Sequence, residues 1–305
     1  MPRRPPVGWS RTVDDTSRVS IDAALGTFNQ TRPRLFGIAY RMLGSVAEAE
    51  DIVQEAWLRW QQTDRTVVHN PPGFLTTVAT RLALNTAGSA RVRREQYVGP
   101  WLPEPVDTAA DPALGAENAE ALETAVLVLL ERLAPEQRAA YVLREAFDYP
   151  YDQIAEVLST STANARQLVS RAKKHVQSQR KESVGPVAHR ALLDAFLAAA
   201  QEGDLTRLEQ VLSADVVTTS DGAGIAPRAA RRPVVGRDKV ARFVAGWNDW
   251  WDDTTVTWLE TNGRASVLVR RGDTPLALLS VSASPSGIDQ LMWVMAPDKL
   301  VHVAG

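Results

Sequence analysis

The residues YDQIAEVLSTSTANARQLVSRAKKH, numbers 151–175, predict two helices joined by a tight turn, and the rest of the architecture follows from them. In the first helix, Ile154 and Leu158 recur at helical spacing on one apolar side. The polar turn 159–161 supplies side chains that suit a helix N-cap. The second helix has an apolar inner face and a polar, basic outer face. This pattern predicts a helix-turn-helix, whose second helix can lie in the DNA major groove.

The outer face of that second helix carries side chains that can read or hold DNA. Arg, Asn and Gln have the fork geometry for base edges, whereas Lys and Ser suit phosphate oxygens. The candidates for contact with duplex DNA are Thr162, Asn164, Arg166, Gln167, Ser170, Arg171 and Lys174. Helix pairs of this length are also common in helical proteins, and Ser159 replaces the glycine often found in the turn. This segment alone therefore leaves both interpretations open.

Helical periodicity extends toward the N-terminus from the helix-turn-helix. A helix is predicted over 122–133, and Pro135 opens the next one, where proline is tolerated. Between about residues 20 and 96, apolar residues recur three and four positions apart. Breaks at Gly44-Ser45 and at 70–73 (NPPG) divide this stretch into three helices.

Between the two helical regions, residues 97–120 lose the helical period. Four prolines in this segment cannot donate backbone hydrogen bonds, so an extended linker is predicted. The linker contains WLPEP, in which Trp101, Leu102 and Pro103 are large or apolar for such a segment. Trp101 either folds back onto a neighbouring domain or makes a docking contact, and the sequence leaves both open.

After residue 185 the pattern changes to helices followed by strands. Helices are expected at 192–200, 204–212 and 237–250, and strands at 216–220, 254–260, 264–270, 275–282 and 287–295. Asn262-Gly263 is a strong two-residue hairpin signal between two of the strands. The region therefore reads as an α+β domain with a curved, mostly antiparallel sheet.

Composition excludes several classes of protein. The 305 residues include no cysteine, which rules out disulfides and thiolate chemistry and fits a cytoplasmic location. No apolar run approaches 18 residues, so no membrane span is expected. The net charge is −2, yet the stretches 81–94 and 160–181 carry only basic charges. These stretches are either phosphate-binding patches or merely solvated helix faces.

Three blocks resemble extracytoplasmic-function sigma factors of bacterial RNA polymerase, in order and in spacing. They are AEAEDIVQEAWLRW (47–60), PPGFLTTVATRLALN (71–85) and LAPEQRAAYVLREAFDYPYDQIAEVLSTSTANARQLVSRAKK (133–174). The motifs WLPEP (101–105) and APDKL (296–300) are similar to those of the group that carries a C-terminal SnoaL-like domain.

The resemblance implies a multidomain protein. Two all-α sigma domains, the second a helix-turn-helix, would precede an α+β SnoaL-like (NTF2-like) cone-shaped barrel. The expected boundaries are a disordered tail over 1–18, a sigma-70 region 2-like domain over 19–96, the linker over 97–120, a region 4-like domain over 121–182 and the SnoaL-like domain over 186–305. No cofactor, metal or catalytic residue is implied.

The resemblance also assigns partners and site residues. The partners are core RNA polymerase, through its β′ clamp helices and β flap, and promoter DNA; a small-molecule ligand of the C-terminal domain is left open. Glu48, Asp51, Gln54, Glu55 and Trp57 would meet the polymerase. His69, Asn70, Phe74, Arg81, Asn85, Arg91, Arg93 and Arg94 would read the opened −10 element, and the helix-turn-helix the −35 element. Phe74 is alternatively explained as a plain core residue.

In the C-terminal domain, Asp221, Asp298 and Lys299 match family motifs and are expected to act, with WLPEP, in regulation between domains. The sequence departs from those motifs, because Ile225 and Ala296 replace their Lys and Asn. Asp221 is interpreted as a turn residue, with Arg228 the nearest base after the glycines. The tryptophans of this domain line an apolar ligand cavity, form a core, or provide a docking face for the helical domains.

Two other functions compete with a sigma factor. A cyclase or isomerase would need an acid and a histidine facing one another in an apolar cavity. A ligand-sensing repressor would use the helix-turn-helix alone and would leave the acidic helix around Glu48 and Glu55 unexplained.

Overall fold

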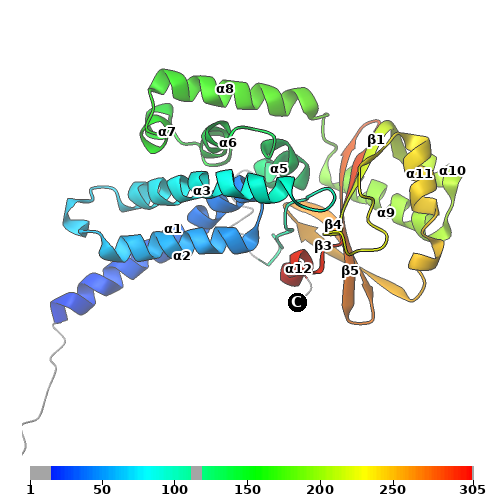
Figure 1. Ribbon diagram of the computed structural model, residues 1–305, viewed down its shortest axis with the longest axis horizontal. Coiled ribbons are helices and arrows are strands. Elements are labelled where there is room, and N and C mark those ends of the chain that lie inside the picture. The colour runs from blue at the N-terminus through cyan, green and yellow to red at the C-terminus, as the bar shows by residue number, and fades with distance from the viewer. Residues whose placement is uncertain (1–14, 111–118, 304–305) are drawn as a thin grey trace, which may run out of the picture.

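The computed structural model describes residues 15–110 and 119–303 (Figure 1). The expected tail, 1–18, lies mostly outside these ranges, and its last four residues belong to the first helix. Among the described helices, none combines the length and the apolar character that crossing a bilayer requires.

The N-terminal domain consists of three helices, α1 (Asp15–Leu43), α2 (Val46–Gln62) and α3 (Pro71–Glu95). The breaks fall where the sequence predicts them. Ser45 caps α2 by accepting a hydrogen bond from the Glu48 N–H, and Asn70 caps α3 in the same way. Proline at the start of α3 costs no hydrogen bond, because the first N–H groups of a helix lack intrahelical partners.

The second helical domain contains the predicted helix-turn-helix. Its elements are η2 (Ala119–Leu122), α5 (Thr124–Leu130), α6 (Pro135–Tyr141), η3 (Val142–Ala146), α7 (Tyr151–Val157) and α8 (Thr162–Gln179). Ser159 adopts φ +52°, a left-handed conformation that explains why glycine is common at this position of the turn. Ser161 then caps α8 through the Asn164 N–H. The helix-turn-helix prediction is confirmed.

The two helical domains share one hydrophobic core. A single cluster of buried residues runs from Phe28 in α1 through Leu75 in α3 to Val169 in α8. At the contact between the domains, the hydroxyls of Thr76 and Tyr149 lie 2.9 Å apart and are hydrogen bonded. Burial of apolar area stabilises this arrangement, which therefore holds the two domains against one another.

The C-terminal domain is α+β, as predicted. Its elements are α9 (Pro186–Glu202), α10 (Leu205–Val211), β1 (Leu212–Asp221), β2 (Val234–Val235), α11 (Arg237–Ala245), η4 (Asn248–Trp250), β3 (Thr254–Thr261), β4 (Arg264–Arg271), β5 (Thr274–Ser284), β6 (Gly287–Val294), α12 (Pro297–Leu300) and η5 (Val301–Val303). The sheet has the order β2-β1-β6-β5-β4-β3, and only the β1–β6 pair is parallel.

Both faces of this sheet are apolar at its centre, because consecutive residues, which point to opposite faces, are buried at 266–269 in β4 and 277–281 in β5. One face packs against α9, α10 and α11, which lie on the side away from the helical domains (Figure 1). The other face includes Leu268 and Leu278 and packs against Leu102 of the linker and Leu300 of α12. The sheet therefore buries its second face only when the linker is in place.

The tryptophans of the domain fill its core. Trp247, Trp250, Trp251 and Trp293 pack against one another with ring centroids 4.8 to 6.4 Å apart. Trp258 lies apart from them beneath the guanidinium of Arg190. For the four packed rings, the interpretation as a core is confirmed over that of a ligand cavity.

The Asn262-Gly263 turn connects β3 to β4 as predicted, with φ angles of +55° and +73°. The buried Asn262 side chain also has contacts that the turn does not require. Its amide nitrogen donates to the Tyr40 hydroxyl at 2.8 Å and to the Leu122 carbonyl, and its oxygen accepts from the Val106 N–H. One turn residue thus joins both helical domains and the linker to the sheet.

Asn262→Gly keeps the left-handed conformation but removes these three hydrogen bonds. Because buried groups are left unsatisfied, we expect the free energy of unfolding to fall by about 2–4 kcal/mol in urea titrations. Asp253→Gly is the control, since Asp253 also has positive φ but is exposed. Equal stabilities of the two variants would contradict a joining role for Asn262.

Candidate nucleic-acid interface

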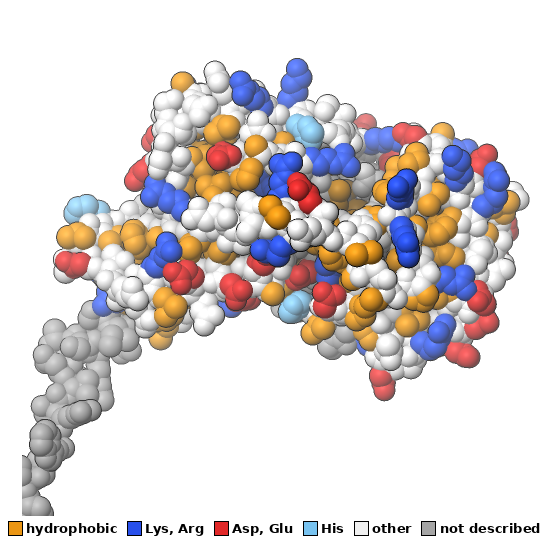
Figure 2. All heavy atoms as spheres, in the orientation of Figure 1, with side chains coloured by type: hydrophobic (Ala, Val, Ile, Leu, Met, Phe, Trp, Pro, Cys, Tyr) orange, Lys and Arg blue, Asp and Glu red, His pale blue; other side chains and the backbone are white. Residues whose placement is uncertain are grey.

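The outer face of α8 is open to solvent. Asn164, Arg166, Gln167, Ser170, Arg171 and Lys174 are all exposed, and Thr162 is half-buried in the first turn. The helix lies at the edge of the molecule, where Lys and Arg side chains project outward (Figures 1 and 2). All seven residues predicted to contact duplex DNA thus lie on one helix, and six of them are accessible.

The residues predicted to form a pocket for an unpaired base lie at the start of α3. His69 and Asn70 are exposed, and the Asn70 side chain accepts the Gly73 N–H as the helix cap. Phe74 is half-buried, with its ring centroid 5.8 Å from that of Trp60. Phe74 therefore packs on the core, the alternative that the sequence allowed. Asn85 is exposed further along α3.

Arg81, predicted to follow single-stranded DNA, instead binds the helix-turn-helix. Its Nε donates to the carbonyl of Val157 at 3.0 Å, and a terminal nitrogen donates to the carbonyl of Glu156 and the hydroxyl of Ser159. These acceptors belong to α7 and to the turn before α8. In this conformation Arg81 joins the two helical domains.

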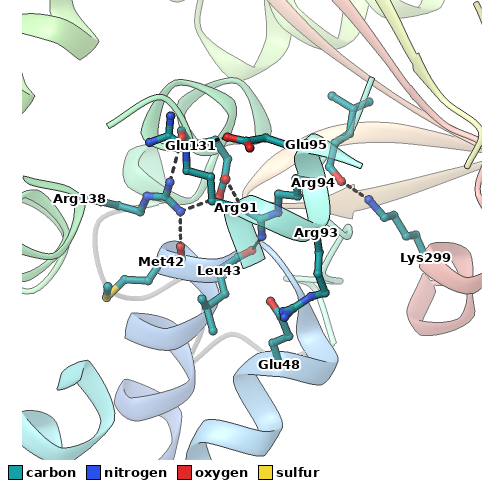
Figure 3. Close-up of polar contacts among 11 residues, drawn as sticks. Met42, Leu43, Glu48, Arg91, Arg93, Arg94, Glu95, Glu131, Arg138 and Lys299 are labelled. Carbon is teal, nitrogen blue, oxygen red and sulfur yellow. Dashed lines mark hydrogen bonds and ion pairs between the residues drawn. The ribbon is translucent and has the colours of Figure 1, made fainter. Parts of the chain in front are cut away.

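Arg94 is also engaged within the chain. Together with Arg138 of α6 it binds Glu131, and the two guanidinium groups donate to the carbonyls of Leu43 and Met42 at the end of α1 (Figure 3). The last carbonyls of a helix have no intrahelical donors and carry partial negative charge. Arginines from α3 and α6 therefore cap α1 from two domains at once.

The other arginines near the end of α3 make weaker contacts. Arg93 pairs with Glu48 of α2, and the exposed Arg91 pairs with Glu95 one turn away. Surface pairs of this kind contribute about 0–1 kcal/mol. Arg91 and Arg93 are therefore easier to redirect toward a nucleic acid than Arg81 or Arg94.

The surface predicted to meet the polymerase lies along α2. Asp51 and Gln54 are exposed, and Glu55 bonds Arg59 in the next turn. The Trp57 ring is half-buried and packs on Phe28, with centroids 4.9 Å apart. Ile52, by contrast, is a core residue. The helix thus presents an acidic and amide surface beside one partly exposed aromatic ring.

The linker segment WLPEP binds the first helical domain. The guanidinium of Arg94 lies 3.8 Å from the Trp101 ring centroid, and the ring packs so closely on Gly44 that a Cβ there would lie 2.6 Å from it. Glu104 accepts the Val46 N–H and donates its own N–H to Gly44. Of the two alternatives for Trp101, the structure shows the ring folded back onto a neighbouring domain.

Asp221 and Lys299 hold the same segment from the other side. One Asp221 oxygen accepts the Leu102 N–H and the Lys299 ammonium, each at 2.7 Å, and the other accepts the Tyr97 hydroxyl at 2.6 Å. Lys299 also donates to the Leu102 carbonyl at 2.6 Å (Figure 3). Asp298, next to it, is exposed.

Asp221 ends β1 and accepts the Ala223 N–H at 3.4 Å, as the interpretation as a turn residue requires, but the turn does not account for its other contacts. The carboxylate is fully buried and its partner is Lys299, 78 positions away along the chain. Arg228, the nearest base after the glycines, instead forms an ion pair with Asp249. Sequence proximity could not identify the partner because β1 and α12 meet only in the folded domain.

Burial governs the ionisation of this cluster. Burial lowers the pKa of Lys299, and the attraction of Asp221 opposes that change. Burial raises the pKa of the Tyr97 hydroxyl, and its hydrogen bond to the Asp221 carboxylate raises it further. Tyr97 therefore stays a neutral donor. Tyr97, Glu104 and Asn262 make contacts between domains that the sequence analysis missed; their positions beside WLPEP, within it and in the hairpin turn were the available signals.

Asp221 faces no histidine that could complete a catalytic pair. His189 is buried and its Nε2 contacts the Val281 carbonyl, while His302 is exposed near residue 303. Across residues 15–110 and 119–303, no group of three or more His, Asp or Glu side chains is arranged to bind a metal.

Known proteins match this architecture. A model of Sigma-70 region 2 matches residues 27–96, and a model of Sigma-70 region 4 matches residues 123–176. The ECF RNA polymerase sigma factor SigJ of Mycobacterium tuberculosis is 48% identical over 224 residues, covering 72% of this chain and 71% of that protein. The chain belongs to the ECF RNA polymerase sigma factors. It is therefore a transcription initiation factor and not an enzyme.

Further relatives extend over the C-terminal domain. The probable ECF sigma factor SigI of M. tuberculosis is 31% identical over 286 residues, covering 92% of this sigma factor and 95% of SigI. The crystal structure of M. tuberculosis SigJ superposes with a TM-score of 0.74 at 37% identity, covering 91% of this chain and 98% of that one. The fold, two helical sigma domains followed by an α+β SnoaL-like domain, is thus that of a known sigma factor.

Removing one member of the Asp221–Lys299 pair leaves the other charge buried. We expect Asp221→Ala and Lys299→Met each to lower the free energy of unfolding by about 3–5 kcal/mol, and the double variant to lose less than the sum. Urea unfolding of the four proteins measures this coupling.

Asp298→Ala is the control for that cycle, because Asp298 is exposed beside Lys299; its effect should stay within about 0.5 kcal/mol. Additive effects of Asp221→Ala and Lys299→Met would mean that the two charges do not stabilise one another.

Arg81→Ala removes three hydrogen bonds between α3 and the helix-turn-helix. We expect faster amide hydrogen exchange over residues 151–162, because that turn loses its contact with the first domain. Arg91→Ala is the matched control on the same helix, since the described partner of Arg91 is Glu95 of that helix. Unchanged exchange in Arg81→Ala would show that this contact does not hold the domains together.

Proposed function

We propose that this sigma factor directs promoter-specific initiation by reading a −10 element with the start and outer face of α3 and a −35 element with α8. The acidic face of α2 would bind the β′ clamp helices of core RNA polymerase, and the region 4 domain its β flap. The C-terminal domain would regulate this activity by holding the chain closed. The site of action would be the cytoplasm, where the polymerase transcribes.

The observation that carries the proposal is unequal access to the two DNA-reading surfaces. The outer face of α8 is exposed, whereas Arg81 and Arg94 of α3 are bound within the chain. Both helical domains also share one core. The names of the two promoter elements place them about 25 base pairs apart, or roughly 85 Å of duplex at 3.4 Å per base pair. Domains in direct contact cannot span that separation, so promoter binding requires them to part.

The linker is where the C-terminal domain would control that separation. The backbone N–H and C=O of its Leu102 bond to Asp221 and Lys299, and the N–H and C=O of its Val106 both bond to Asn262. The same linker contacts α2 through Glu104. Opening the helical domains while the linker stays bound would break contacts at Gly44 and Val46. Release of the linker from the sheet is therefore the proposed regulatory step.

A reversible covalent lock tests the proposal, because the chain has no cysteine of its own. Asp107 of the linker forms an isolated antiparallel bridge with Thr261 of β3, a pairing whose Cα separation suits a disulfide. We expect reduced Asp107→Cys/Thr261→Cys protein to co-elute with bacterial core RNA polymerase and to start run-off transcription. The oxidised protein should give at least ten-fold less run-off transcript than the reduced protein. Adding reductant should restore the amount of transcript.

Each outcome addresses a different part of the proposal, and the wild-type chain under the same oxidant is the control. If the wild-type and reduced chains fail to associate with core polymerase, promoter-specific initiation is excluded. If the oxidised chain transcribes as well as the reduced chain, release of the linker is not required and the regulatory role is wrong.

A further inference from the structure

An arginine-rich groove of about 590 Å³ lies where the three domains meet. Arg91 and Arg94 reach it from α3, Arg132 from the turn after α5, and Arg231 and Arg232 from the segment between β1 and β2. Trp101 and Leu102 form part of its floor. Arginines that are far apart in sequence thus line one site only when the chain is closed.

The positive charge of this groove is not neutralised by the protein. Five arginines line it against two glutamates, Glu95 and Glu131, a formal excess of three positive charges. Glu131 is already shared between Arg94 and Arg138, and Glu95 pairs with Arg91 (Figure 3). Neither carboxylate is therefore available to the remaining arginines.

Three guanidinium groups are left to bind something else. Arg132 donates to the neutral Gln179 side chain at 2.8 Å. Arg231 and Arg232 are exposed and have no hydrogen bond or ion pair with the described residues. Like charges gathered from separate segments repel one another, more strongly in a groove than in open water. A bound anion would replace this repulsion among the arginines with attraction between each arginine and the anion.

The lining also has an apolar part, formed by Pro100, Val128 and Pro233. The volume lies within the range of about 300–1,000 Å³ that is usual for small-molecule sites. An arginine guanidinium can donate two parallel hydrogen bonds to two oxygens of one phosphate group. We propose that this groove binds a small organic molecule carrying a diphosphate group, with the phosphates on Arg132, Arg231 and Arg232 and the organic part on the apolar lining.

Such a ligand would bridge all three domains and stabilise the closed arrangement. Lys and Arg side chains of the C-terminal domain stand opposite those of the helical domains across the middle of the face shown in Figure 2. Because the ligand binds the closed form, it should raise the melting temperature with its concentration. This inference needs neither polymerase nor promoter, so its failure and that of the proposed function are distinguishable.

Calorimetric titration of the full chain at fixed ionic strength tests the site, with inorganic pyrophosphate and ADP as probes and no divalent metal. We expect both to bind with one site per chain, ADP at least as tightly as pyrophosphate because of its organic part. Arg231→Ala/Arg232→Ala should weaken both at least ten-fold. The double variant should fold, because neither side chain has a described partner.

Lys239→Ala/Arg242→Ala is the matched control, since it removes two exposed positive charges from α11 of the same domain, outside the groove. It should change either affinity less than two-fold. Three outcomes would overturn the proposal: neither probe binds, both double variants weaken binding equally, or pyrophosphate binds more tightly than ADP. If neither probe binds but a duplex oligonucleotide binds through Arg231 and Arg232, the groove binds nucleic acid and not a small diphosphate.

Discussion

A buried ion pair holds the backbone of Leu102 on both sides: Asp221 accepts its N–H and Lys299 donates to its C=O. Neither charge can remain buried alone without a large desolvation cost, and the linker supplies the hydrogen bonds that each still needs. The neutral Tyr97 hydroxyl completes the acceptor capacity of Asp221. The closed arrangement of the three domains depends on this contact.

The sheet of the C-terminal domain also needs the linker, because the linker buries part of its apolar surface. Its first face is covered by its own helices, but its second face is covered by Leu102 and α12 together with partly buried residues of α5. Leu102 therefore contributes in two ways: its backbone bonds to the buried ion pair, and its side chain packs on the sheet. A linker that left the sheet would expose apolar surface and two charges simultaneously, so its release would cost free energy.

Two arginines that we propose to contact promoter DNA are used here to hold the protein together. Arg81 binds the turn of the helix-turn-helix, and Arg94 caps α1 while stacking on Trp101. The same guanidinium groups can donate either to carbonyl oxygens of the chain or to phosphate oxygens, but not to both. Under the proposed function, a closed chain would therefore bind opened DNA less well than its composition suggests. Arg231 and Arg232 differ, since closure gathers them with other arginines and they have no hydrogen-bond or ion-pair partner within residues 15–110 and 119–303.

The sequence by itself determined the local elements and the family. The helix-turn-helix, the breaks at Gly44-Ser45 and before Pro71, and the Asn262-Gly263 hairpin all follow from periodicity, capping and turn chemistry, which act over a few residues. Only the tertiary structure decided the partner of Asp221, the second role of Asn262 and the use of Arg81. Those contacts join residues 76 to 222 positions apart, and which distant side chains meet depends on how apolar faces pack, information that no short-range pattern contains.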